Sequence, residues 1–180
     1  MTYTFVVGNG TSNRRWKGVK LTPSIGCNLG IKDWDFDYLI CADRMAVAEI
    51  RKLPNKPNTN YWLKKSTLEV PPGWNEMEFP GIDSGSAALK LAAIRYPNNP
   101  IIVIGFDGVL NISNENAYTY PFRKAPTAPA IRERHRQSVL DLLDELPPVQ
   151  FVSFDKDPEL ETICYDHAFK IAITQSRSLS

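Results

Sequence analysis

Short apolar runs recur along the chain, and most of them are bounded by turn residues. Four such runs, at residues 5–7, 39–42, 101–104 and 151–154, lack the apolar–polar alternation of a half-exposed strand. Runs of this kind are typical of strands that are covered on both faces of a sheet. A weaker extended run at residues 21–27 predicts a further strand.

Two longer segments have helical periodicity instead. Residues 84–96 and 130–146 carry apolar side chains three or four positions apart, which predicts a helix in each. Strands that alternate with helices indicate a single-domain, Rossmann-like α/β fold with a mostly parallel sheet and helices on both faces. We expect this domain to span residues 1–174 and residues 175–180 to form a frayed tail.

Two segments break the pattern. Residues 53–80 are rich in Pro and Asn, and residues 110–129 contain Asn, Tyr and Pro with little periodicity. A connection as long as the second one is usually functional, so we expect residues 110–129 to form a lid-like loop.

The composition narrows the functional classes. The chain has 180 residues, a formal net charge of +1 and 43% hydrophobic residues, which suits one domain with a hydrophobic core. So small a net charge creates no bulk field for nucleic acid, and the basic run 132–136 predicts a solvated helical face. No apolar window of about 18 residues is present, so we expect no membrane span, no signal peptide and a cytoplasmic location. The three cysteines form no Cys-x-x-Cys pair, and we expect them to be reduced and buried.

The first strand run ends in Gly8-Asn9-Gly10-Thr11-Ser12. Glycines at such a turn allow a sugar or phosphate to approach the backbone, and Asn9 offers both a donor and an acceptor. An ordinary strand-to-helix turn is the alternative. A dinucleotide fingerprint also needs a third glycine and an acidic residue about 20 positions later, where this chain has Asn13 and Asn28.

Asn28 ends the second strand run. Ligands of open α/β sheets bind beyond the carboxyl ends of the strands, where Asn28 and Gly10 are expected to be neighbours. Two asparagines there suit a pyrimidine edge or a ribose, although Asn28 alone also suits a turn cap. Asp107 follows the run 101–104 and belongs to the same edge.

Ser84 and Gly85 open the predicted helix 84–96. Ser84 is a plausible N-cap, and the free N–H groups beside it suit a phosphate, because the positive end of the helix dipole points there. Capping alone also explains the serine.

Three further side chains suit group-transfer chemistry. Tyr118 and Tyr120, in the predicted lid, offer hydroxyls that hold a phosphate without a metal ion, although loop tyrosines also pack on surfaces. His135 is the better placed of the two histidines for acid–base work near neutral pH, although a buried structural histidine is the alternative. The chain has no His-x-x-x-His or Cys-x-x-Cys spacing, and we expect no metal cofactor.

Five short motifs, taken together, resemble the bacterial sialyltransferase superfamily, in particular Campylobacter-type enzymes and related small Rossmann-like proteins. They are Val-Val-Gly-Asn-Gly-Thr-Ser at 6–12, Gly-Cys-Asn at 26–28, Ser-Gly-Ser-Ala-Ala at 84–88, Ile-Gly-Phe-Asp at 104–107 and His-Arg-Gln at 135–137. The resemblance implies a metal-independent glycosyltransferase that uses a CMP-sugar as its donor.

The same resemblance implies roles for individual residues. Asn9 and Asn28 contact the nucleotide, with the Ser84–Gly85 helix start nearby. Tyr118 and Tyr120 hold the leaving phosphate, and His135 is the general base that deprotonates the acceptor hydroxyl.

The chain also departs from this pattern. Thr11 replaces a proline that is frequent in the glycine turn, and Asp-Tyr-Leu-Ile-Cys-Ala-Asp at 37–43 is more similar to a related pterin-pyrophosphokinase-like branch, which brings Asp43 into the site. Two other functions stay open: a nucleotide-binding module without catalysis, and a pyrophosphoryl transferase that uses Mg²⁺ on Asp43 and Asp107. Trp62 and Trp74 favour either an acceptor platform or a homo-oligomer contact.

Overall fold

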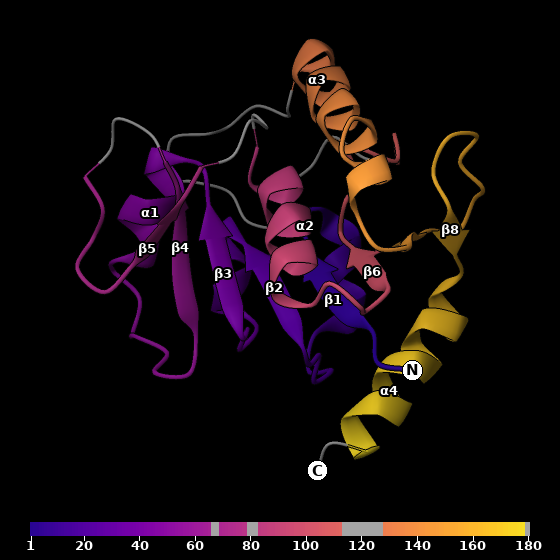
Figure 1. Cartoon of the computed structure of the whole chain (residues 1–180), viewed down its shortest axis with the longest axis horizontal. Coiled ribbons are helices and arrows are strands. Elements are labelled where there is room, and N and C mark those ends of the chain that lie inside the picture. Colours follow the sequence, from indigo (N-terminus) through magenta and orange to yellow (C-terminus); the bar gives the residue numbers. More distant parts are fainter. Residues whose placement is uncertain (66–68, 79–82, 113–127, 179–180) are drawn as a thin grey trace.

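The computed structural model describes residues 1–65, 69–78, 83–112 and 128–178, and within them eight strands form one fully parallel sheet. The spatial order is β5-β4-β3-β2-β1-β6-β7-β8 (Figure 1). The strands are β1 (Thr4–Val7), β2 (Ser24–Cys27), β3 (Tyr38–Cys41), β4 (Asn60–Lys64), β5 (Asn75–Met77), β6 (Ile101–Ile104), β7 (Val149–Val152) and β8 (Thr162–Ile163).

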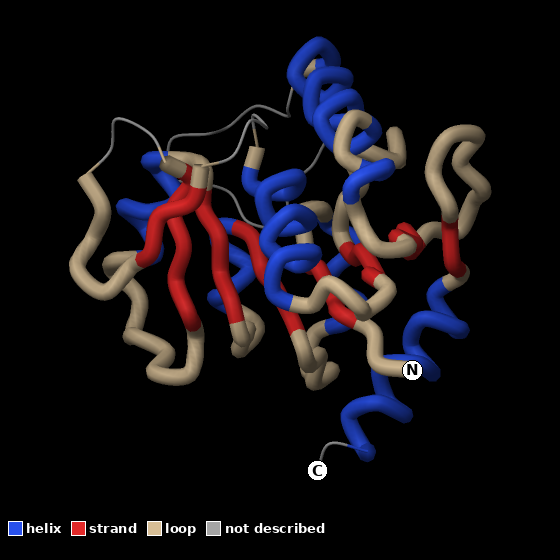
Figure 2. Tube along the Cα trace, in the orientation of Figure 1, coloured by secondary structure: helices blue, strands red, loops and turns tan. Residues whose placement is uncertain are grey.

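Helices cover both faces of this sheet, as the sequence predicted (Figure 2). One face carries the 3₁₀ helices η1 (Thr11–Trp16) and η2 (Asn28–Lys32) together with α1 (Arg44–Ile50) and α4 (Tyr165–Ser178). The other face carries α2 (Ser84–Arg95) and α3 (Pro129–Leu140), and the short η3 (Leu143–Glu145) follows α3. None of the described helices combines the length and apolarity that crossing a membrane requires.

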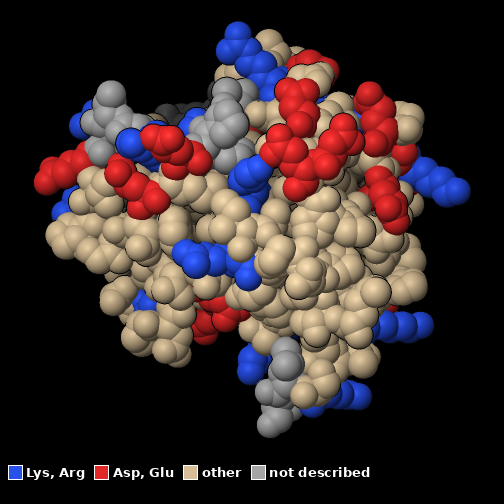
Figure 3. Space-filling view, in the orientation of Figure 1, with Lys and Arg blue, Asp and Glu red and all other residues tan. Residues whose placement is uncertain are grey.

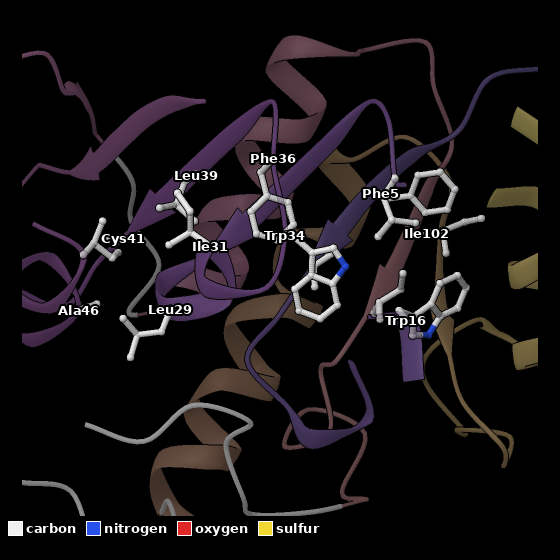
Figure 4. Packing of buried hydrophobic residues seen from close by; sticks show 14 of the residues in the cluster. Phe5, Trp16, Leu29, Ile31, Trp34, Phe36, Leu39, Cys41, Ala46 and Ile102 are labelled. Atoms are coloured by element: carbon white, nitrogen blue, oxygen red, sulfur yellow. The ribbon is translucent and has the colours of Figure 1, made fainter. Parts of the chain in front are cut away.

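Aromatic side chains dominate the core under η1 and η2. Trp34 stacks on Phe36, with ring centroids 6.1 Å apart, and Trp16 groups with Phe5 and Ile102 (Figure 4). Their burial supplies much of the hydrophobic stabilisation on this face, because large aromatic side chains remove the most apolar area from water.

The strand order places the switch point of the sheet between β1 and β6. From β1 the chain builds outward through β2 to β5, and it then crosses back to form β6 on the other side of β1. Because the connections diverge there, the crevice beyond the carboxyl ends of β1 and β6 is where a doubly wound sheet binds ligands.

Several predicted boundaries need correction. The run 151–154 forms β7 two residues earlier, and Phe154 is 63% exposed. Helix α3 ends at Leu140 rather than continuing to 146. Strands β4 and β5 lie in the segment 53–80, where the pattern predicted neither.

The predicted tail is part of α4 as far as Ser178. Gln175 is buried, and its side-chain amide forms two hydrogen bonds with the backbone of Tyr3, the residue before β1. Tyr3 N–H donates to Gln175 Oε1 and Gln175 Nε2 donates to Tyr3 O, both at 2.8 Å. Gln175 Nε2 also donates to Thr22 O at 2.7 Å. This end of the chain is therefore held against the sheet, because a buried amide with these partners resists fraying. Most of the predicted lid, residues 113–127, lies outside the described residues.

Candidate nucleotide-binding site

The glycine turn after β1 packs directly on the chain that follows β6. Gly8 N–H donates to Ile104 O and Gly10 N–H donates to Gly105 O, each at 2.7 Å. A Cβ atom on Gly10 would lie 2.5 Å from Asp107 Cγ and 2.6 Å from Gly105 O. The turn therefore needs glycine for contact within the protein, whether or not a ligand also approaches it.

Asp107 closes the same turn from the β6 side. The side chain is 2% exposed, and it accepts hydrogen bonds from Thr11 Oγ1 at 3.1 Å, from Ser12 N–H at 2.8 Å and from Ser12 Oγ. These donors belong to the start of η1, so Asp107 caps that helix from the turn that follows β6. Burial raises the pKa of Tyr165, and the nearby Ser12 side chain opposes that rise only in part.

Asn13 stands where a dinucleotide fingerprint has its third glycine. The side chain is buried, and its Nδ2 donates to Gly8 O at 2.9 Å, which holds the turn in shape. Asn9 lies half-buried between the two glycines.

Ser84 links the carboxyl ends of β2 and β3 to the start of α2. Its hydroxyl accepts a hydrogen bond from Ala42 N–H and donates one to Asn28 Oδ1, both at 2.8 Å, and the residue is 5% exposed. The sequence predicted Ser84 as the N-cap of α2, and this prediction is wrong. Asp83 takes that position and accepts from Ser86 N–H at 2.9 Å, so the N–H groups of Ser84 and Gly85 stay outside the cap.

This relay orients the Asn28 amide. Because Asn28 Oδ1 accepts from Ser84, the Nδ2 group is left as a donor, and no described residue accepts from it. Asn28 has a φ of 50°, a left-handed conformation that Asn and Asp adopt more readily than other side chains. Asn28 therefore presents two N–H donors at the carboxyl edge, next to the first turn of α2.

Asp43 caps α1, since its side chain accepts from Met45 N–H at 2.8 Å. Asp43 and Asp107 are thus each engaged by helix-start donors. Within the described ranges, no group of three or more His, Cys, Asp or Glu side chains is arranged to hold a metal ion.

None of the three predicted catalytic residues is linked to the glycine turn by a contact that the structure describes. His135 is half-buried on α3, which packs beside α2. Tyr118 and Tyr120 lie outside the described residues. The structure therefore brings Gly8, Asn9, Gly10, Ser12, Asn28, Ser84, Gly85 and Asp107 to the carboxyl edge of β1, β2 and β6, with Asp43 after β3.

Arg136 is a residue whose place the sequence pattern missed. The run 132–136 predicted a solvated face, yet the Arg136 side chain is 7% exposed and pairs with Asp157 through two hydrogen bonds, at 2.8 and 3.0 Å. The guanidinium also donates to Val109 O at 2.6 Å and to Glu159 at 2.7 Å. Hydrogen bonds from Arg136 are the main reason that the pKa of Asp157 is lowered, although burial opposes them. Arg136 thus ties α3 to the segments that follow β6 and β7.

The geometry of this edge is the basis for any functional conclusion. Comparison of the chain with protein-family models, with curated proteins and with solved structures finds no match.

Proposed function

We propose that this protein binds a nucleotide-activated sugar of the CMP type at the carboxyl edge of β1, β2 and β6 and transfers the sugar to a hydroxyl acceptor without a metal ion. The observation that carries the proposal is the relay from Ala42 through Ser84 to Asn28, which presents amide donors beside the glycine turn. This edge includes the switch point of the sheet, where doubly wound folds bind nucleotides.

Each part of a cytidine nucleotide has a matching group. The Nδ2 donors of Asn28 suit the carbonyl oxygen and the unprotonated ring nitrogen of cytosine, which only accept hydrogen bonds. The N–H groups of Ser84 and Gly85, at the positive end of the α2 dipole, suit the phosphate. Asn9, in the glycine turn, suits the ribose.

The transfer step needs a proton acceptor and stabilisation of the leaving group. The bond between the anomeric carbon and the phosphate oxygen breaks, and the phosphate keeps the electron pair. A bond forms between that carbon and the acceptor oxygen, whose proton passes to His135. By the family resemblance, the hydroxyls of Tyr118 and Tyr120 donate to the phosphate as its charge grows.

Engagement of both carboxylates disfavours the magnesium-dependent alternative. Asp107 accepts hydrogen bonds from Thr11 and Ser12, and Asp43 accepts one from Met45. Mg²⁺ demands near-octahedral oxygen ligation, and an ion shared by the two carboxylates would compete with these caps.

Thermal denaturation with CMP, UMP, NAD and CMP-sialic acid, each with and without Mg²⁺, tests the binding site. CMP at about 100 times its dissociation constant should stabilise the protein by about 2.7 kcal/mol, which raises Tm by roughly 5–11 °C. Asn9→Ala should reduce this shift. Asn28→Asp should abolish it, because Asp retains the oxygen that accepts from Ser84 and tolerates the left-handed backbone but lacks the N–H donors.

Transfer is tested separately by release of CMP from CMP-sialic acid in the presence of hydroxyl acceptors. His135→Ala should slow release by about 10²–10⁴-fold and leave the CMP-induced shift in Tm unchanged. Binding of CMP without release by the wild-type protein, across a broad set of acceptors, would instead identify a non-catalytic nucleotide-binding module. Activity that requires Mg²⁺ would contradict the metal-independent mechanism.

A further inference from the structure

A pair of aromatic residues, the exposed Phe154 and the half-buried Tyr165, lies together with an arginine beyond the carboxyl ends of β1, β7 and β8. The rings of Phe154 and Tyr165 stack with centroids 4.4 Å apart and an interplanar angle of 26°. The guanidinium carbon of Arg15 is 4.5 Å from the Phe154 centroid and 5.3 Å from the Tyr165 centroid. We refer to Arg15, Phe154 and Tyr165 as the aromatic platform.

The platform leaves one face of Phe154 uncovered by its own members. Tyr165 and Arg15 lie 4.4 Å and 4.5 Å from the centroid of the Phe154 ring. If they lay on opposite faces of that ring, the distance between them would approach the sum of these two values. The guanidinium carbon of Arg15 is only 5.3 Å from the Tyr165 centroid, so they do not lie on opposite faces. Phe154 is accordingly 63% exposed. Arg15 forms no ion pair with any described carboxylate, so its charge is available to a ligand.

The platform is connected to the candidate nucleotide site. Tyr165 lies near enough to Ser12 for that side chain to affect its pKa, and Ser12 in turn donates to Asp107 under the glycine turn. In the strand order, Asn28 follows β2 on one side of β1 and Phe154 follows β7 on the other. A ligand on the platform is therefore separated from a nucleotide at Asn28 by the glycine turn.

Packing within the protein does not account for Phe154. Trp16 is 1% exposed, and its ring centroid lies 6.4 Å from that of Tyr165 and 5.6 Å from that of Phe169. Tyr165 and Phe169 therefore cover this part of the core without a contribution from Phe154. An exposed phenyl ring presents a negative π face, which attracts the polarised C–H groups of a sugar ring, and the neighbouring guanidinium attracts an anion.

We propose that the aromatic platform is the acceptor subsite and takes a sugar ring that carries one carboxylate or phosphate. The sugar stacks on Phe154, and its anionic group pairs with Arg15; this assignment of the acceptor class rests on the transferase function proposed above. Exposed carboxylates gather over α3, η3 and the β7–β8 connection (Figure 3), among them Asp141, Asp144, Glu145, Asp155, Glu159 and Glu161. This negative surface repels a long polyanion, and the platform offers the one positive charge of Arg15 to one anionic group.

Calorimetric titration of the full chain with three probes tests the proposal. The probes are methyl β-glucuronide for a carboxylate, glucose 6-phosphate for a phosphate and methyl β-glucoside as the neutral match. Wild type should bind at least one charged probe about tenfold more tightly than the glucoside, because a charge-assisted hydrogen bond to Arg15 is gained. Phe154→Ala should weaken the binding of the charged probe by about tenfold.

Two variants separate the roles of the ring and the charge. Arg15→Gln should remove the preference for the charged probe over the glucoside. Phe169→Ala is the control, because Phe169 is a 41% exposed aromatic residue of the same cluster that lies outside the platform. Its affinity for every probe should equal that of wild type.

Three results would overturn the proposal: no heat with any probe at 50 mM, Phe154→Ala binding like wild type, or Phe169→Ala losing as much as Phe154→Ala. A CMP titration run in parallel distinguishes the two proposals. Loss of CMP binding in Phe154→Ala would place the cytosine ring on the platform and refute the platform's role as the acceptor subsite. Absence of CMP binding by wild type, with sugar binding intact, would refute the nucleotide site alone.

Discussion

Replacing Arg136 with methionine should be among the most damaging single changes in the part of the chain that the structure describes. The side chains of Arg136 and Asp157 are 7% and 9% exposed and form two parallel hydrogen bonds, and Arg136 also satisfies Val109 O. Methionine preserves most of the side-chain volume but leaves the Asp157 carboxylate buried without its partner. Breaking such a pair on one side costs about 3–5 kcal/mol, whereas the contact to the 57% exposed Glu159 adds little.

For a chain of this length, that loss lowers Tm by roughly 6–20 °C. Urea denaturation of Arg136→Met at neutral pH measures the free energy of unfolding directly. Arg134→Met is the matched control, because Arg134 lies on the same helix and is exposed, and it should change stability by no more than about 0.5 kcal/mol.

The pH dependence provides an independent check. The pKa of Asp157 is lowered in the folded protein, so its stabilising effect is complete above its unfolded pKa of about 3.9 and is lost as the pH falls through the folded value. Below that point both proteins carry a neutral Asp157, and the difference in unfolding free energy between wild type and Arg136→Met should shrink. A loss below about 1 kcal/mol at neutral pH, or a difference that does not change on acidification, would refute this reasoning.

Two further predictions concern the glycine turn and the thiols. Gly10→Ala forces a Cβ to within 2.5 Å of Asp107 Cγ; we expect urea denaturation to show a loss of about 1–3 kcal/mol from overpacking, and stability equal to wild type would contradict the packing of the turn. Burial raises the pKa of the Cys27 and Cys41 thiols, whereas Cys164 is exposed. One thiol should therefore react quickly with Ellman's reagent in the native protein and three after unfolding, and rapid reaction of three in the native state would contradict this burial.

The central strands could be predicted because they are buried on both faces. The sequence Ile-Ile-Val-Ile of β6 has no other plausible environment, and its predicted bounds match those in the structure. Strand β5 has the sequence Asn-Glu-Met, and only Met77 is buried in it, so no hydrophobic pattern marks this edge strand. Its pairing with β4 decides its conformation, and that is a tertiary effect.

Buried polar side chains account for the main errors in the helices. Gln175 and Arg136 are both buried. The sequence pattern instead placed Gln175 in a frayed tail and Arg136 on a solvent-exposed helical face. Each is stabilised by partners far away in sequence: Gln175 by the backbone of Tyr3, and Arg136 by Asp157. In the predicted helix 130–146, the apolar Ile131 is 41% exposed, whereas the charged Arg136 is buried on the inward face together with Val139. Hydrophobic periodicity cannot anticipate such pairs, because it counts a paired polar residue as an exposed one.

The candidate site illustrates a different limit. That Gly10, Asn28 and Asp107 meet at one edge follows from the rule that parallel strands present their carboxyl ends together. The direction of the hydrogen bonds does not follow from that rule. It depends on Ser84, which accepts from Ala42 and donates to Asn28.

These directions decide which residues are informative about function. The fold itself requires Gly10 for its contact with Gly105, and it uses Asp107 and Asp43 as helix caps, so these residues would be needed even in a protein that binds nothing. Asn28 differs, because its oxygen has a structural use, while its two N–H donors face no acceptor among the described residues. Asn28→Asp keeps an oxygen that accepts from Ser84, but it replaces the two N–H donors by a negatively charged carboxylate oxygen. If CMP stabilises this variant as much as wild type, the amide is not part of a nucleotide site, and the proposed function loses the observation on which it rests.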